Sequence, residues 1–315
     1  MSLMPDLGAF GTALAGIAPL TPAPLSAPLG RAVLVGSGDS LASALVAARF
    51  GHRALSSGDL TWTGSVPPGC DTVVGVSHSG TSGATVRALR LARGAGLHTV
   101  AVTSRPDSPL AEAAADVQPV PALPVTETVP CAGHVMLALG VAAVCGLDVK
   151  PAPERLAAAL PRIRALAEQA VAELPEEAPH AISILSLPEL RSAADFWSLK
   201  LIEATGIAAR VVPLEESGHV DYFIGPQRHL TLALAGTAGL TRFDRLAEAL
   251  VGTGQVVRRI TVRDIVDGDD AEVLTDVAAA IAGAAVAHAA ATRWERRPFR
   301  GGAVNMDARH IKLDD

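Results

Sequence analysis

Residues 71–85 read Asp71-Thr72-Val73-Val74-Gly75-Val76-Ser77-His78-Ser79-Gly80-Thr81-Ser82-Gly83-Ala84-Thr85. The first part is typical of a buried strand, and the pattern predicts a helix that begins at about Ser82. The loop between them contains four hydroxyl side chains, on Ser77, Ser79, Thr81 and Ser82. Glycines let a backbone turn and approach a ligand closely, and the first amides of a helix attract an anion. Because the loop has no lysine, it suits a phosphate monoester better than a triphosphate; the alternative is a serine-capped helix after a turn.

Strand-like runs alternate with helical patterns on both sides of this stretch. We expect strands at residues 31–35, 71–76, 98–103 and 117–120, and again at 180–186, 207–213, 229–235 and 255–261. Helices are expected at residues 7–17, 40–50, 82–95, 108–115, 127–145, 154–174, 188–205, 240–251 and 270–294. This alternation predicts an α/β protein with two doubly wound parallel sheets.

The two halves of the chain read as a distant internal duplication. Residues 72–83 and 230–239 each pass from a strand through a glycine-containing loop toward a helix, but the second copy has Ala235-Gly236-Thr237-Ala238 in place of the hydroxyls. Only the first half is therefore expected to hold a phosphate. We expect an N-terminal helix and proline-rich arm over 1–30, one domain over 31–150, a second over 151–294, and a tail over 295–315 that closes over a site.

Composition excludes several classes of function. With 49% hydrophobic residues, the 315-residue chain can bury a large core, and a net charge of −6 with no basic run argues against nucleic acid. Three cysteines without paired spacing indicate free thiols in a reducing cytoplasm. The N-terminus has no basic region followed by an apolar run, and the longest apolar stretch, residues 135–145, is too short to span a bilayer. We expect a soluble cytoplasmic protein without a membrane partner.

The turn Gly36-Ser37-Gly38-Asp39-Ser40 and the hydroxyl loop resemble the sugar isomerase (SIS) domain. Two such domains in one chain resemble the phosphosugar isomerases, the isomerase half of glucosamine-fructose-6-phosphate aminotransferase, and the bifunctional phosphoglucose/phosphomannose isomerases. The resemblance implies two flavodoxin-like SIS subdomains related by duplication. It also implies a sugar phosphate held by Ser40, Ser77, Ser79, Gly80, Thr81 and Ser82, with the sugar contacted by Gly38, His78, Glu127 and Arg309.

Two of these sugar contacts depart from the family pattern. The segment from Glu127 to His134 is similar to the family's Glu-x-x-x-Ala-Ser-Thr-Lys stretch, but its hydroxyls and lysine are missing here. In the tail, Arg309 stands where the aminotransferases have a lysine that forms a Schiff base, and Lys312 would fill that position only after a slip of three residues.

In the second half, Lys200-Leu201-Ile202-Glu203 is followed sixteen residues later by His219, the spacing that the family shows. The resemblance implies that Glu203 moves a proton between sugar carbons 1 and 2 and that His219, expected in a loop, helps to open the ring. Lys200 lies one helical turn before Glu203 and would hold it in place, although this spacing more often marks a surface ion pair. The continuation His219-Val220-Asp221 replaces the aminotransferases' His-Gly-Pro and points away from that branch.

Chain geometry separates two of these residues. Glu203 is expected near the end of a helix, and the seven residues from 207 to 213, in extended form, cover roughly 20 Å before His219. The two side chains should lie at opposite edges of the sheet unless the loop doubles back. We therefore expect a homodimer in which His219 is supplied across the interface.

Three functions remain open at this point. The first is a metal-free aldose–ketose isomerisation of a hexose or aminohexose 6-phosphate through an enediolate, with no cofactor. The second is an aminosugar-phosphate deaminase or deglycase, and the third is a sugar-phosphate sensor without catalysis. The nine histidines show no HxH or HExxH spacing, which argues against a metal. The turn after the first strand has Leu41 where a dinucleotide fingerprint needs its third glycine.

Overall fold

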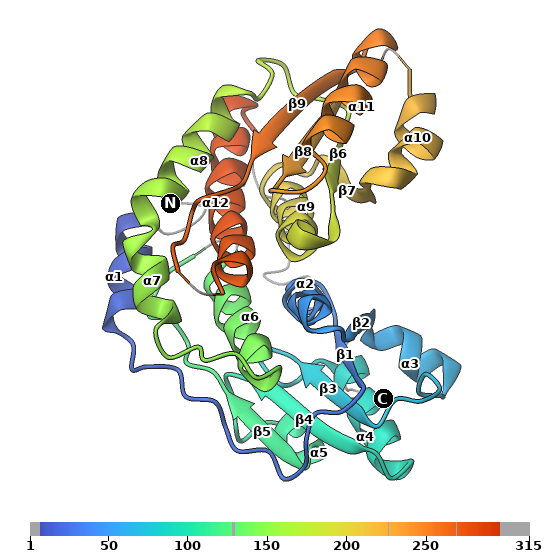
Figure 1. Cartoon of the computed structure of the whole chain (residues 1–315), viewed down its shortest axis with the longest axis vertical. Coiled ribbons are helices and arrows are strands. Elements are labelled where there is room, and N and C mark those ends of the chain that lie inside the picture. Colours follow the sequence, from blue (N-terminus) through green and yellow to red (C-terminus); the bar gives the residue numbers. More distant parts are fainter. Residues whose placement is uncertain (1–6, 128–129, 226, 269, 297–315) are drawn as a thin grey trace. The chain divides into compact units, whose positions relative to one another are not determined.

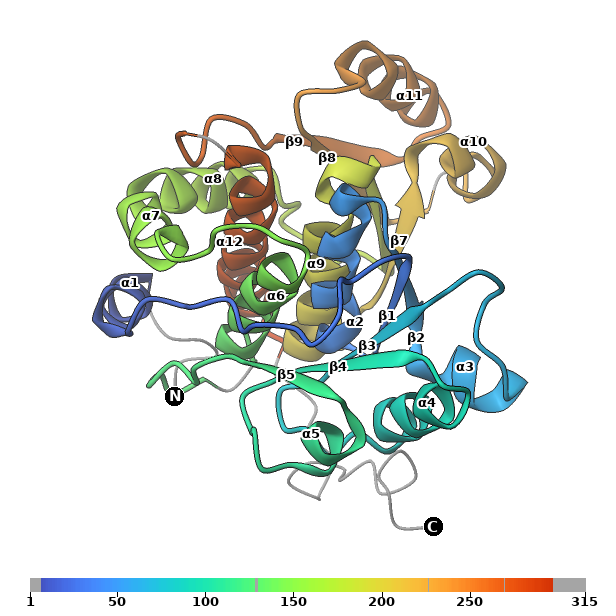
Figure 2. The same ribbon diagram turned by 60° about the horizontal axis from the view of Figure 1, so that its bottom comes forward.

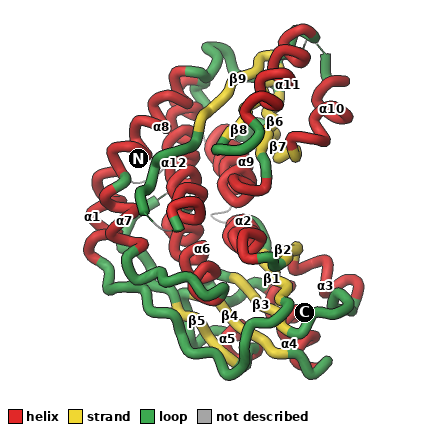
Figure 3. Tube along the Cα trace, viewed as in Figure 1, coloured by secondary structure: helices red, strands yellow, loops and turns green. Residues whose placement is uncertain are grey.

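The computed structural model describes residues 7–127, 130–225, 227–268 and 270–296. The described residues form two compact units. One unit comprises residues 12–125 and 132–155 and contains strands β1 to β5. The other comprises residues 7–11, 126–131 and 156–296 and contains strands β6 to β9. Each unit is a parallel sheet covered by helices, which confirms the predicted α/β class (Figure 3).

The sheet of the β1–β5 unit has the strand order β2-β1-β3-β4-β5, and all of its neighbouring strands are parallel (Figure 1). This is the flavodoxin-like order. Its strands are β1 Ala32–Gly36, β2 Arg53–Ser56, β3 Thr72–Val76, β4 His98–Thr103 and β5 Asp116–Pro119. The central strands β1 and β3 are buried throughout, as expected for continuous apolar runs covered on both faces.

Helices cover both faces of this sheet. Helix α4 packs with α3 and α5 on one face, whereas α2 packs with α6 on the other. The helical segments between residues 7 and 158 are α1 Leu7–Gly16, α2 Asp39–Ala44, the 3₁₀ helix η1 Leu45–Phe50, α3 Ser57–Thr63, α4 Gly83–Gly94, α5 Pro109–Ala113, α6 Ala132–Val144 and α7 Ala152–Ala158. The helix expected over 40–50 is thus divided, and the helix expected from residue 127 begins only after Pro130.

The proline-rich arm packs along the edge strand β5. The backbone N–H of Ala23 donates to Gln118 Oε1 at 2.7 Å, and both the N–H and the hydroxyl of Ser26 donate to Asp116 Oδ2 at 2.8 Å. His98 Nε2 lies 2.7 Å from the same carboxylate oxygen. The arm therefore covers the edge strand, and an edge covered in this way is protected from pairing with another chain.

The sheet of the β6–β9 unit has the order β7-β6-β8-β9, again all parallel. It repeats the order β2-β1-β3-β4, as internal duplication predicts. Its strands are β6 Ala181–Ser186, β7 Ala208–Pro213, β8 His229–Ala235 and β9 Val256–Thr261. Its helical segments are α8 Leu160–Ala172, η2 Pro188–Leu190, α9 Arg191–Thr205, η3 Leu214–Glu216, α10 Ser217–Val220, η4 Asp221–Phe223, α11 Leu240–Gly252 and α12 Ala271–Arg293.

Two groups of helices sandwich this second sheet. Helices α9 and α12 pack together on one face, with α8 against α12, while α11 and the short segment α10–η4 lie on the opposite face (Figure 2). Helix α12 is long and apolar enough to cross a membrane, but 78% of its apolar window is buried inside the structure. That degree of burial is typical of the core helix of a globular unit.

Trp197 of α9 packs closely against Gly283 of α12. The Trp197 side chain is fully buried, and its Nε1 donates to the carbonyl of Ala279 at 2.8 Å. A Cβ atom added at Gly283 would lie 2.2 Å from Cδ1 and Nε1 of Trp197. Glycine at this position lets the indole lie directly on the helix backbone.

We expect Gly283→Ala to destabilise the protein by about 1–2 kcal/mol, because overpacking of the indole outweighs the gain of about 1 kcal/mol in helix propensity. The matched control is Gly94→Ala in α4, where an added Cβ meets no atom within 4 Å. Thermal denaturation measures both changes. A Gly283→Ala protein as stable as the Gly94→Ala protein would contradict this packing.

Candidate functional site

The carboxyl edge of the β1–β5 sheet contains a topological switch point. The chain leaves β1 toward β2 and leaves β3 in the opposite direction toward β4. Loops that diverge in this way leave a crevice outside the carboxyl ends of the two strands, where ligands of open α/β sheets bind. Residues 37–40 follow β1 and residues 77–82 follow β3 at this edge, and they are the two segments that the sequence indicates for a phosphate.

Glycines shape both of these loops. A Cβ atom at Gly36 would lie 2.6 Å from the carbonyl carbon of Ser40 and 2.7 Å from the nitrogen of Leu41. A Cβ at Gly80 would lie 2.0 Å from Ser108 Oγ, and Gly80 has a φ of +66°. Only glycine adopts this conformation without strain, so Gly80 fixes the path of the hydroxyl loop.

The hydroxyls of this loop hydrogen bond one another. Ser77 Oγ accepts from the N–H of Gly80 and lies 3.2 Å from Ser82 Oγ. Ser79 Oγ lies 2.9 Å from Thr81 Oγ1 and accepts from the N–H of Thr81. Ser77 is buried, but Ser79 and Thr81 are exposed to solvent. Helix α4 begins directly afterwards and has no acidic residue in its first turn. The loop therefore presents rotatable donors and a helix N-terminus together, a combination that suits an anion.

A second group of hydroxyls ties the two loops together, and the sequence analysis did not identify it. Ser57 Oγ lies 2.8 Å from Ser37 Oγ, accepts from Thr85 Oγ1 at 3.1 Å, and donates to the carbonyl of Gly36 at 3.1 Å. Ser57 follows β2, a four-residue strand in which no residue is buried and which has no apolar pattern. The only local signal was the Ser56-Ser57-Gly58 turn.

A positive charge also lies beside the hydroxyl loop. Arg105 follows β4, and its N–H donates to Thr103 Oγ1 at 3.1 Å. Burial lowers the pKa of His78, and the charge of Arg105 lowers it further. The imidazole of His78 lies against Gly133, where an added Cβ would be 3.0 Å from its Cδ2. Arg105 stands at the carboxyl edge of the same sheet, and its place directly after a predicted strand was a usable signal.

The remaining predicted contacts, Ser40 of the phosphate and Glu127 and Arg309 of the sugar, have varied surroundings. Ser40 lies half-buried in the first turn of α2, directly after Gly38, whose φ is +57°. Glu127 is half-buried, and its Oε2 accepts from the N–H of Cys131 at 2.8 Å. His134, which replaces the family's lysine, is buried, with Nδ1 3.0 Å from Ser43 Oγ. Arg309 and the tail lie outside the described residues.

Lys200 and Glu203 form a close pair on α9. Lys200 Nζ donates to both carboxylate oxygens of Glu203, at 3.0 and 2.8 Å, and lies 5.0 Å from the centre of the Phe196 ring. The Lys200 side chain is 0% exposed and that of Glu203 is 32% exposed. The alternative of a surface ion pair is therefore wrong. Because a buried ammonium needs a partner, Lys200 holds the partly exposed carboxylate in a fixed position.

His219 is exposed on α10, a single helical turn rather than the expected loop. It follows β7, whereas Glu203 precedes this strand, so the two residues lie at opposite ends of β7. The segment after β7 does turn back, but over the face covered by α11, and α9 lies on the other face. Within one chain, the structure does not bring Glu203 and His219 together.

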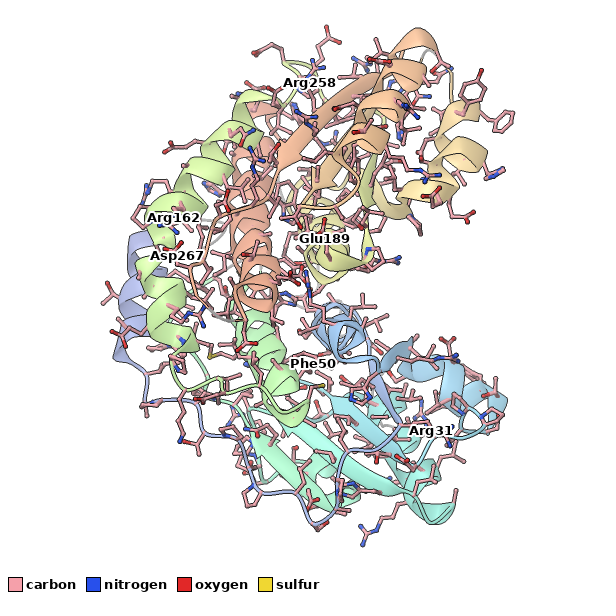
Figure 4. The ribbon with its side chains drawn as sticks, in the orientation of Figure 1. Arg31, Phe50, Arg162, Glu189, Arg258 and Asp267 are labelled. Atoms are coloured by element: carbon pink, nitrogen blue, oxygen red, sulfur yellow. The ribbon has the colours of Figure 1, made fainter. Side chains whose placement is uncertain are left out.

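The equivalent switch point in the β6–β9 sheet contains a carboxylate of the protein itself. Glu189, labelled in Figure 4, follows β6 and reaches the loop after β8. Its carboxylate accepts from Thr237 Oγ1 at 3.1 Å and from the N–H of Ala238 at 3.2 Å. A Cβ at Gly236 would lie 2.3 Å from Glu189 Oε1. In this copy a carboxylate of the protein itself thus accepts hydrogen bonds from the loop after β8.

A cavity of about 500 Å³ lies at the amino edge of the β1–β5 sheet, away from the hydroxyl loop. Arg31 and Phe50, both labelled in Figure 4, contribute to its lining together with His52 and Arg53. Open α/β sheets bind their ligands at the carboxyl edge. We therefore place the candidate site at the hydroxyl loop and not in this cavity.

Across residues 7–296, leaving aside the four undescribed positions inside that range, no three His, Cys, Asp or Glu side chains gather as a metal ion would require.

The structure predicts that His78 titrates below its ordinary pKa of 6.5. Because this pKa is lowered, the contribution of His78 to stability is present above pH 6.5 and is lost as the pH falls toward the folded-state pKa. We expect Arg105→Gln to raise the pKa of His78 in an NMR titration, but not to its full ordinary value, because burial is the larger cause. Arg90→Gln, an exposed change on α4, serves as the control. Equal titration curves for the two variants would show that Arg105 does not act on His78.

Comparison with known proteins was made by sequence and by structure. No family model and no curated protein sequence matches the chain. The C-terminal domain of glucosamine-fructose-6-phosphate aminotransferase from Francisella tularensis aligns with a TM-score of 0.67 at 14% identity, over 93% of this chain and 95% of that chain. Glucosamine-6-phosphate deaminase from Thermotoga maritima aligns at 0.64 and 15% identity, over 90% and 87%. Tagatose-6-phosphate ketose/aldose isomerase from Escherichia coli aligns at 0.62 and 17% identity, over 84% and 82%.

At these identities the likeness concerns the fold. It extends over most of the chain and includes both sheets. The chain shares the two-sheet α/β fold of sugar isomerase domain proteins, as its glycine turn and hydroxyl loop predicted.

Proposed function

We propose that this protein is a sugar-phosphate isomerase that interconverts the aldose and ketose forms of a hexose or aminohexose 6-phosphate. The observation that carries the proposal is the hydroxyl loop of residues 77–82 at the switch point of the β1–β5 sheet. Its glycines, exposed hydroxyls and helix N-terminus suit a phosphate monoester. The nearby guanidinium of Arg105 adds a favourable charge. The names of the aligned structures, an isomerase and a deaminase of sugar phosphates among them, agree with this ligand class.

Glu203 is the proposed base. An aldose–ketose interconversion needs one group that takes a proton from the carbon beside a carbonyl and returns it to the neighbouring carbon. A carboxylate held in one position by Lys200 is suited to both transfers, because it need not reorient between them. Lys200 is the proposed positioning residue. In this proposal Gly38, His78, Glu127 and Arg309 contact the sugar.

His219 is proposed to open the sugar ring, and a second copy of the chain is proposed to supply it. The support is that Glu203 and His219 occupy opposite faces of one sheet within a single chain. The residues after His219 also favour self-association, since Tyr222 and Phe223 are 49% and 77% exposed in a chain that is only 3% aromatic. Exposed aromatic side chains that gather on one segment are typical of an interface.

The phosphate loop is tested by Ser79→Ala combined with Thr81→Ala. Because a hydrogen bond to a charged group contributes about 1.5–3 kcal/mol, we expect the affinity for fructose 6-phosphate to fall at least about tenfold. Calorimetric titration measures the affinity, and the exposed Ser65→Ala is the control. Unchanged affinity would show that the phosphate does not bind at this loop. Release of ammonia from glucosamine 6-phosphate during turnover would show that the protein is a deaminase and not an isomerase.

The shared active site is tested by mixing two inactive variants. Glu203→Gln and His219→Asn should each lower turnover by at least about 100-fold, the range lost with a general acid or base. After joint refolding we expect about a quarter of wild-type activity, since half of the dimers are mixed and each has one complete site. Failure to recover activity would show that both residues act within one chain or that His219 has another role. A fully active monomer in sedimentation would exclude the dimer.

A further inference from the structure

A buried charged network joins the segment that bears His219 to the β6–β9 sheet. The Asp221 side chain is completely buried. Ser183 Oγ donates to Asp221 Oδ1 at 2.5 Å, and Arg210 Nη2 lies 3.0 Å from the same oxygen. Ser183 is on β6 and Arg210 on β7, and the two residues are paired across these strands. Asp221, in η4, therefore sits directly on the sheet, two residues after His219.

The hydrogen bonds of this network determine which nitrogen of His229 carries a hydrogen. Ser183 has one hydroxyl hydrogen, which goes to Asp221, so its oxygen accepts from Arg210 Nε at 3.3 Å and from His229 Nε2 at 2.9 Å. His229 must then carry a hydrogen on Nε2. Burial, the largest cause, lowers the pKa of His229; Asp221 acts against this change and Arg210 acts with it. A neutral imidazole with its hydrogen on Nε2 meets both requirements.

The main chain of η4 is held as well. Gln255, which lies directly before β9, donates from Nε2 to the carbonyl of Asp221 at 2.6 Å. Asp221 is thus bound to residues of β6 and β7 through its carboxylate and to the start of β9 through its backbone. On either side of it, His219, Tyr222 and Phe223 are exposed. Asp221 is therefore the buried point of residues 219–223, while Leu214 and Ser217 are buried at the start of the same segment.

A hydrolytic Ser–His–Asp triad does not explain this cluster. Ser183 is completely buried, and it donates to Asp221 instead of to the histidine. A triad requires the serine to donate to the histidine and the histidine to donate to the aspartate. A purely stabilising role also fits poorly, because apolar side chains in place of a buried ion pair are often neutral or stabilising. A buried charge that can be paired in only one place does, however, determine where its segment lies on the sheet.

We propose that Asp221 is a positioning residue that fixes residues 214–223 on the sheet and thereby presents His219 to the reaction. This inference rests on the proposed role of His219. It gives a reason for the aspartate that follows His219 in the sequence His219-Val220-Asp221. The partners of Asp221 lie on three separate strands or strand ends, so the anchor forms only when the sheet is complete.

The experiment compares Asp221→Asn, His219→Asn and the double variant in the full-length protein. Asparagine keeps the shape of the side chain but removes the charge. Asp244→Asn is the matched control, since Asp244 pairs with Arg259 on the exposed side of α11 in the same unit. Amide hydrogen exchange of residues 214–223 reports the position of the segment, and kcat and KM for fructose 6-phosphate report its use.

We expect Asp221→Asn to speed exchange in residues 214–223 at least about tenfold and to lower kcat with little change in KM. The double variant should be no slower than His219→Asn, because the two residues act through one group. Losses that multiply, or unchanged exchange, would overturn the proposal. If Asp221→Asn does not fold, Arg210→Gln replaces it, since the Arg210 side chain is 46% exposed and still leaves Asp221 its serine. If His219→Asn is fully active while Asp221→Asn shows faster exchange, Asp221 still fixes the segment but His219 has no part in the proposed reaction.

Discussion

In a parallel sheet the carboxyl ends of all strands lie at the same edge, and the helices that follow the strands point their free N–H groups toward that edge. This constraint applies twice in the chain, because both units have the same order of their first four strands. The two copies satisfy it differently. The β6–β9 unit places the carboxylate of Glu189 in its switch-point loop. The β1–β5 unit instead presents hydroxyls that hydrogen bond one another and the N–H groups of their own loop. The duplicated fold thereby acquires one candidate anion site instead of two.

Buried charges determine where the other functional groups lie. The ammonium of Lys200 has no exposure to water and fixes Glu203 on α9, on one face of the β6–β9 sheet. The carboxylate of Asp221 fixes the segment of His219 on the other face. In each case the buried group is a poor candidate for chemistry, while its exposed neighbour is a good one. The low dielectric of the interior makes such pairs strongly directional, and this is how they position a side chain.

The sequence predicted those parts of the fold that depend on local patterns. The strands β1, β3, β4 and β8 are almost entirely buried and rich in aliphatic residues, and the hydroxyl loop lies between a strand and a helix as its glycines indicated. The strand β2 and the serine that follows it were missed, because a strand of four residues, none of them buried, has no apolar pattern to detect.

Contacts between distant residues could not be predicted. The spacing of Lys200 and Glu203 is the same on a surface and in a core, so the burial of Lys200 left no local signal. The Asp221 network joins residues from position 183 to position 255, and the sequence near Asp221 does not indicate which residues it contacts.

The central claim is that one loop of this chain, and not its duplicate, holds a sugar phosphate. The stoichiometry of fructose 6-phosphate binding, measured by calorimetric titration, tests it most directly. We expect one molecule of fructose 6-phosphate to bind per chain. Two molecules per chain would show that Glu189 does not fill the second switch point, and no binding of this or any related hexose phosphate would contradict the assignment of the hydroxyl loop.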